Sequence, residues 1–218
     1  MGQQNQNKII RKLKSKKSIW LVIVFILIIA VVFSFFVYQK NHLNIYNSNI
    51  LGIENALVNN HKIILSLDDF NKIYPKINST KTDAWDCGSP FEWLDKEWMT
   101  KTYGNKNEET GTFDNFNGKI TTIYGDNIEF ASDNHIVLFQ SAKAENNIFM
   151  IKSPEITLDK NTTLENFQKI FPKVEKEILK NPNEVRFRFY LGPEEGGAFL
   201  FYFKNGKLDY LTLWWQLC

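Results

Sequence analysis

The sequence predicts an α+β protein: an N-terminal single transmembrane helix followed by a duplicated helix-plus-antiparallel-sheet domain. Three observations lead to this prediction. An uncharged apolar segment lies near the N-terminus, and an eleven-residue motif occurs twice. After the second copy, apolar and polar residues alternate in the pattern typical of β-strands. The 218 residues are 44% hydrophobic and 23% charged, which excludes collagen-like and fully disordered chains.

The apolar segment, residues 18–39, contains no charged side chain. A helix needs about 20 apolar residues to cross a bilayer. Trp20 and Tyr38 lie near its ends, where amphipathic rings suit the membrane interface. A cleaved signal peptide, the alternative, has a shorter apolar region that ends in small residues. No such residues end this segment, so we expect an uncleaved signal anchor in contact with the lipid bilayer through residues 18–39.

The charges predict the orientation of this anchor. Residues 1–17 contain six basic side chains and no acidic one, and basic flanks stay in the cytoplasm. We therefore expect residues 1–17 to form a basic cytoplasmic tail at the cell inner (plasma) membrane. Residues 40–218 then lie in the periplasm or outside the cell. They hold 20 basic and 24 acidic side chains, and this acidic balance argues against nucleic acid as a partner.

The remaining chain divides into three predicted parts. Residues 40–60 are rich in Asn and predict a linker with a short helix over 50–58. Residues 61–151 form a first α+β repeat with a Trp-rich insertion at 83–104. Residues 152–218 form a second α+β repeat with a C-terminal β-meander.

The repeated motif spans residues 66–76 and returns at 163–173 with six of eleven positions identical. Ser66 and Thr163 are suitable helix N-caps, apolar residues follow at helical spacing, and a proline ends each motif. We therefore expect two short helices that pack on a sheet, because such short helices are not stable alone. The motif serves either a duplicated folding unit or a twofold binding surface. The apolar spacing favours the folding unit.

The strongest strand signals lie near the C-terminus. Alternation predicts strands at 185–191, 198–203 and 208–215, joined by a Gly-rich turn at 192–197 and an Asn-Gly hairpin turn. Weaker signals predict four more strands, at residues 119–124, 127–130, 136–141 and 147–151.

The Trp-rich insertion has its own helix signal. Ser89, Pro90 and Glu92 mark a helix start, and Gly104 marks its end. Acids beside tryptophans suggest a cell-wall hydrolase as one alternative; they are Asp86, Glu92 and Asp95. A cap or a solvated helix face also explains each of these acids, so we expect no enzyme.

Cys87 and Cys218 are the only cysteines, and an even pair outside the cytoplasm predicts a disulfide. A nucleophilic Cys87 would need a histidine partner, and no spacing pairs one with it. The three histidines show no ligand spacing, so we predict neither a metal nor a small-molecule cofactor.

The remaining candidates form a surface. Alternation places Arg186, Arg188, Tyr190 and Tyr202 on the face of the last sheet that points away from the core, together with Tyr210. Arg and Tyr are typical anchors of protein interfaces. The alternative is ordinary cross-strand packing, with arginine stems covering the tyrosine rings. The other partner-binding candidates are Trp85 and Trp93 of the insertion and Glu194 and Glu195 of the Gly-rich turn.

Two segments carry a resemblance. The run WDCGSPFEWL at 85–94 and the run YLTLWWQLC at 210–218 resemble segments of uncharacterised membrane-anchored periplasmic proteins of gamma-proteobacteria. That resemblance implies an anchored extracytoplasmic body and no activity. The layout of one anchor and a small acidic body is similar to that of immunity proteins. We expect a non-catalytic domain that binds one protein partner, in its sharpest form an immunity or inhibitor protein. An envelope assembly or scaffolding subunit is the alternative.

Overall fold

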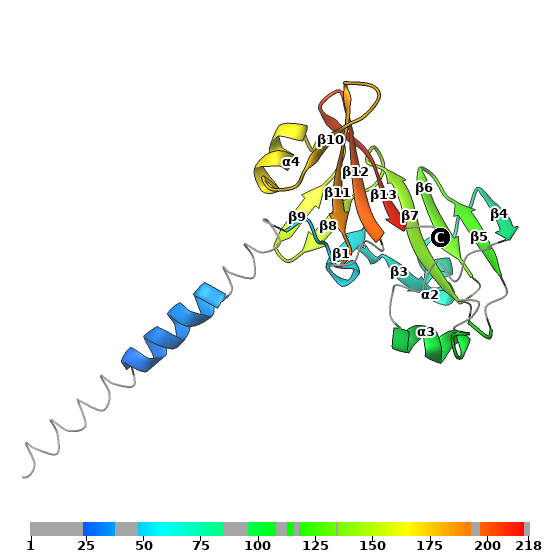
Figure 1. Cartoon of the computed structure of the whole chain (residues 1–218), viewed down its shortest axis with the longest axis horizontal. Coiled ribbons are helices and arrows are strands. Elements are labelled where there is room, and N and C mark those ends of the chain that lie inside the picture. The colour runs from blue at the N-terminus through cyan, green and yellow to red at the C-terminus, as the bar shows by residue number, and fades with distance from the viewer. Residues whose placement is uncertain are drawn as a thin grey trace, which may run out of the picture. The chain divides into compact units, whose positions relative to one another are not determined.

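The computed structural model describes residues 24–37, 48–84, 96–107, 113–115, 118–133, 135–192 and 197–215 (Figure 1). It divides the chain into two units, Met1–Asn44 and Ile45–Cys218. In the first unit, residues 24–37 are helical and their side chains are exposed. Among the described residues, no helix has the length and apolar character to cross a bilayer. The predicted anchor extends beyond this helix on both sides.

The second unit is α+β and consists mainly of antiparallel sheet. Its described helices are α2 (Leu67–Ile73), α3 (Lys96–Tyr103) and α4 (Leu164–Ile170), with a 3-10 turn at Ile53–Asn55. The four-stranded sheet has the order β2 (His61–Lys62), β1 (Ala56–Val58), β8 (Phe149–Lys152), β9 (Glu155–Leu158). The nine-stranded sheet contains β3 (Ile64–Ser66), β4 (Ser79–Ala84), β5 (Lys119–Tyr124), β6 (Ile128–Ser132), β7 (Ile136–Lys143), β10 (Lys176–Ile178), β11 (Glu184–Tyr190), β12 (Gly197–Lys204) and β13 (Lys207–Trp215).

The order of the large sheet is β10-β11-β12-β13-β7-β6-β5-β4, and β3 also pairs with β7. Two four-stranded meanders therefore meet edge to edge, where Leu211 of β13 lies opposite Ala142 of β7. We call α2 with β4–β7 the first half of this sheet and α4 with β10–β13 the second half. Each half begins with its helix and ends at the shared edge.

The two predicted short helices are confirmed. The Ser66 hydroxyl accepts a hydrogen bond from the Asp69 amide at 3.1 Å, and the Thr163 hydroxyl accepts one from the Asn166 amide at 3.2 Å. Each cap satisfies an amide that the first helical turn leaves free. Both helices end in the same backbone conformation, with φ −117° and ψ 68° at Tyr74 and φ −121° and ψ 66° at Phe171.

Both helices attach to equivalent places in their halves. The Leu67 amide donates to the His135 carbonyl at 3.2 Å, directly before β7. The Leu164 amide donates to the Gly206 carbonyl at 2.9 Å, directly before β13. Each helix thus begins beside the first residue of the last strand of its own meander.

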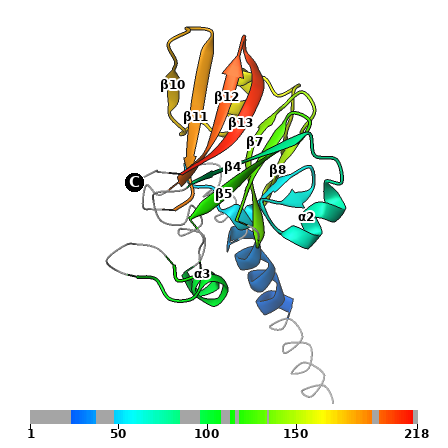
Figure 2. The same ribbon diagram turned by 90° about the vertical axis from the view of Figure 1, so that its right-hand side faces the viewer.

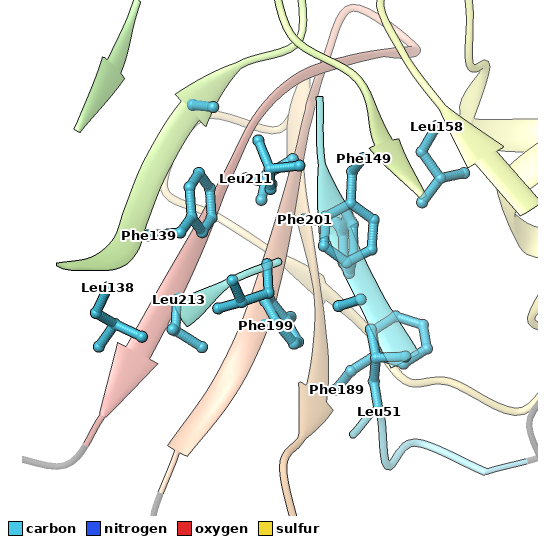
Figure 3. Close-up of a cluster of buried hydrophobic side chains, with 14 of the residues drawn as sticks. Leu51, Leu138, Phe139, Phe149, Leu158, Phe189, Phe199, Phe201, Leu211 and Leu213 are labelled. Atoms are coloured by element: carbon cyan, nitrogen blue, oxygen red, sulfur yellow. The ribbon is translucent and has the colours of Figure 1, made fainter. Parts of the chain in front are cut away.

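The core lies between the large sheet, the two short helices and the small sheet. Figure 3 shows Phe149 of β8 beside Phe199 and Phe201 of β12. The ring centroids are 5.3 and 5.1 Å apart. Phe167 of α4 packs on the same face of the sheet, 5.4 Å from Phe201. We call this the inner face of the large sheet. Burial of these rings removes apolar surface from water, which is the main force that holds the layers together.

The region of residues 50–58 differs from the prediction. The expected short helix is wrong, because this region forms the 3-10 turn and strand β1. Asn59 and Asn60 adopt positive φ values of 51° and 66°, which turn the chain back into β2 as a tight hairpin. Leu51, Ala56 and Val58 are buried, so the core extends into the segment predicted as a linker.

The seven predicted strands are confirmed to within a few residues. Strands β1, β2, β3, β4, β9 and β10 were not predicted. Most of them are only two to four residues long, too short for a hydrophobic run or alternation to identify a strand, and β4 is exposed along its whole length. The predicted end of the insertion helix is confirmed, because Gly104 follows α3 with φ 85° and donates to the Thr100 carbonyl at 2.9 Å. Its predicted start lies outside the described residues.

Candidate interaction surface

The outer face of the large sheet, opposite α2 and α4, carries a row of side chains across five strands. Strand register places Glu177 opposite Arg186, Arg186 opposite Tyr202, Tyr202 opposite Tyr210, and Tyr210 opposite Lys143. Residues directly opposite each other in a sheet point to the same side. The row therefore runs from the edge strand β10 across the second half to β7.

Two further rows lie parallel to it. Arg188, Leu200 and Thr212 form one, and Tyr190, Ala198 and Trp214 form the other. Leu200 and Ala198 are buried, although both lie outside the main core cluster. They form a thin apolar layer on the outer face, beneath the larger side chains around them.

Arg186 is fully engaged within this surface. Its Nε donates to Glu177 Oε2 at 2.9 Å, a second guanidinium nitrogen donates to the same oxygen, and a third lies 3.5 Å from the Tyr202 hydroxyl. Burial alone would lower the pKa of Arg186, but its hydrogen bonds to Tyr202 and Glu177 outweigh this and hold it above the ordinary value. Its contacts are those of a structural ion pair.

Tyr202 and Tyr210 stack face to face, with ring centroids 4.2 Å apart and an interplanar angle of 10°. The Arg186 guanidinium lies over the Tyr202 ring, 5.8 Å from its centroid. Burial is the largest cause that raises the pKa of Tyr210, followed by the neighbouring Tyr202 and the carboxylate of Asp209. The Tyr210 hydroxyl therefore stays protonated at neutral pH.

Arg188 is held differently from Arg186. Its guanidinium lies 5.9 Å from the Tyr190 ring centroid and 5.5 Å from that of Trp214. Its Nε is 3.3 Å from Glu177 Oε1, and this is its one ion pair among the described residues. Two aromatic rings thus fix the position of a guanidinium whose terminal nitrogens have no carboxylate partner in the described part of the chain.

A groove of about 390 Å³ continues this surface beyond Tyr210. The residues that line it include Ser141 and Lys143 of β7, Glu129 of β6 and Tyr124 of β5. The Ser141 hydroxyl lies 3.1 Å from Glu129 Oε2 and donates to it. The Lys143 side chain is exposed and has no ion pair within the described ranges.

The middle of the outer face of the first half is buried, whereas its edge strand β4 is exposed. Its outward residues Ile120, Ala131 and Leu138 are buried, unlike the arginines and tyrosines of the second half. In the inserted segment, Tyr103 and Phe113 are buried and belong to the main core cluster. Tyr103 lies edge-on to His135, 5.5 Å between centroids, and Figure 2 shows α3 and α2 on opposite sides of β5.

The structure brings together four of the eight predicted partner-binding residues: Arg186, Arg188, Tyr190 and Tyr202. Trp85, Trp93, Glu194 and Glu195 lie outside the described residues, as do Cys87 and Cys218 of the predicted disulfide. The acids of the hydrolase alternative, Asp86, Glu92 and Asp95, lie outside them too.

Sequence reasoning missed Glu177, Lys143 and Trp214. Alternation from Tyr210 through Thr212 would have placed Trp214 on the same face. No local signal identifies Glu177 or Lys143, because their place depends on which strands become neighbours.

Comparison with protein-family models, with curated proteins and with solved structures finds no match for this chain. The surface must therefore be interpreted from its own chemistry.

Proposed function

We propose that this chain is a membrane-anchored, extracytoplasmic, non-catalytic protein that binds one protein partner through the outer face of its second half. The observation that carries the proposal is the constrained cluster of Arg188, Tyr190 and Trp214 on an otherwise apolar layer. Arg, Tyr and Trp are the residues most enriched in interface hot spots. Rigid side chains also lose less entropy on binding, which favours affinity.

The proposal includes the anchor and the duplication. Residues 18–39 would hold the body at the outer side of the inner membrane, because the basic tail stays in the cytoplasm. The repeated motif, the matching caps and the matching helix attachments support a duplicated helix-plus-meander unit. In an immunity protein, such a body would bind and block a toxin.

A co-purification experiment tests this function. The full chain would carry an affinity tag in the cell that makes it, and its complexes would be isolated from detergent-solubilised envelope. We expect one stoichiometric partner, whose recovery falls about tenfold in Trp214→Ala. The matched control is Ile178→Ala, which removes a more exposed apolar side chain from β10 and should retain the partner.

Deletion of residues 1–39 separates the inhibitor from a scaffold that works through its span. An inhibitor body should keep its partner after this deletion, whereas such a scaffold should lose it. Recovery of the same partner by Trp214→Ala and the native chain would contradict the proposed surface.

A further inference from the structure

We propose that the outer face of the second half, together with the adjoining strand β7 of the first half, recognises an acidic segment of the partner, with Arg188 and Lys143 as the two anchoring cations. This inference rests on the proposed function, because it gives the chemistry of the partner at the same surface.

Three carboxylates of this face are engaged. Glu177 holds Arg186 and Arg188, Glu184 pairs with Lys204 at 3.1 Å, and Glu129 accepts from Ser141. Asp209 is the remaining acid in the part of this face that the structure describes, and it lies where β13 bulges next to Tyr210. Among the described residues of this face, Glu129 and Asp209 therefore keep a negative charge without a cation partner, and neither forms an ion pair with Arg188 or Lys143.

Two cations have unused capacity. The terminal nitrogens of Arg188 bind no carboxylate among the described residues, and Lys143 forms no ion pair there. Arg186 and Lys204 differ, because each is already matched with a carboxylate. A guanidinium is well suited to bind a carboxylate through two parallel hydrogen bonds.

The separation of the two anchors favours a chain with several acids over a single small anion. Arg188 lies on β11 and Lys143 on β7, three strand spacings apart, which is about 14 Å across the sheet. The rings of Tyr202 and Tyr210 lie between these strands, and the groove beside Lys143 offers about 390 Å³ for a side chain. A protein segment supplies both spaced carboxylates and apolar side chains.

A peptide titration tests the inference on the full chain in neutral detergent. The probe is a fluorescein-labelled peptide of alternating glutamate and leucine, followed by fluorescence polarisation at low salt. We expect the native chain to bind it and to lose affinity as salt rises. Arg188→Ala and Lys143→Ala should each weaken binding about fivefold, as expected for partly exposed charge pairs.

Two controls use the paired cation and the remaining acid. Lys204→Ala should stay within about twofold of the native chain, since Glu184 already engages this lysine. Asp209→Asn should tighten binding, because it removes the acid that would repel the peptide. A peptide of alternating lysine and leucine should not bind.

Equal binding by the native chain, Arg188→Ala and Lys143→Ala would overturn the inference. Complete displacement of the peptide by phosphatidylglycerol added to the detergent would overturn it too, because the face would then recognise a lipid headgroup. Either result leaves the proposed function standing if the co-purified partner still depends on Trp214. If recovery of the partner does not depend on Trp214, that result contradicts the proposed function itself.

Discussion

On the inner face of the large sheet, Phe167 of α4 contacts five aromatic rings, whereas its counterpart Phe70 of α2 contacts two among the described residues. Ile73, Ile123 and Ile128 lie around Phe70 and line a groove of about 260 Å³ there. The same framework is therefore densely packed in one half and looser in the other.

The outer faces of the two halves also differ, in the kind of side chain that they carry. In the first half, the middle of this face holds the buried apolar residues Ile120, Ala131 and Leu138. In the second half, half-buried arginines and tyrosines remain on the surface. The half with the denser core is therefore the one whose outer face carries half-buried charged and aromatic side chains, and a dense core gives the rigid support that the proposed binding surface requires.

The largest expected difference between the halves concerns their helix phenylalanines. Phe167→Ala should lower the free energy of unfolding by about 4 kcal/mol, since the packed rings cannot collapse into the cavity. Phe70→Ala should cost about 3 kcal/mol, because the groove beside it lets neighbours move inward. Urea unfolding followed by circular dichroism measures both. Equal losses would show that the two halves are packed equally well.

The second comparison concerns how much Arg186 and Arg188 each contribute to stability. Arg186→Ala should cost about 1.5 kcal/mol of stability, because it removes charge-assisted hydrogen bonds to Glu177 and leaves that partly buried carboxylate with Arg188 alone. Arg188→Ala should cost about 0.5 kcal/mol, a value ordinary for a surface pair. The same unfolding measurement decides this. A larger loss for Arg188→Ala would mean that its role is structural.

The N-caps of α2 and α4 should contribute about equally to the free energy of unfolding. Ser66→Ala and Thr163→Ala should each cost about 1 kcal/mol, since both hydroxyls accept one amide at nearly the same distance. The controls are Ser66→Thr and Thr163→Ser, which keep a hydroxyl at each cap and should change stability little. Losses that differ several-fold between the sites would contradict equivalent caps.

The smallest effect concerns pH. Burial is the largest cause that raises the pKa of Tyr74, and a hydrogen bond from Asn59 acts in the opposite direction. A raised pKa means that the folded state holds this proton more tightly, so the stabilisation is complete below about pH 10, the ordinary value. It is lost as the pH rises through the folded-state pKa. Tyr74→Phe should therefore lose less stability than the native chain as the pH rises above about 10.

Phe171 occupies the equivalent position in the second half and cannot ionise, so Phe171→Tyr is the matched control. It should introduce a further loss of stability at alkaline pH. Identical alkaline slopes for the native chain and Tyr74→Phe would contradict the burial of the Tyr74 hydroxyl.

The two short helices could be predicted from the sequence because every determinant lies within eleven residues: a hydroxyl cap, helical spacing of apolar side chains and a proline stop. The Arg and Tyr face of β11 and β12 followed from alternation in the same way. The pairing of β13 with β7 could not be predicted, because it joins residues about 70 positions apart through backbone hydrogen bonds. Glu177 and Lys143 join the surface only through such pairing.

The most direct test of the central claim compares two threonines on the outer face. Thr212 lies at the centre of the open second half, and Thr122 lies among the buried residues of the first half. A photo-cross-linking amino acid would replace each in turn in the full chain, in the cell that makes it. The account predicts a discrete adduct with one partner protein from position 212 and none from position 122. An adduct from position 122 alone, or equal adducts from both, would contradict it.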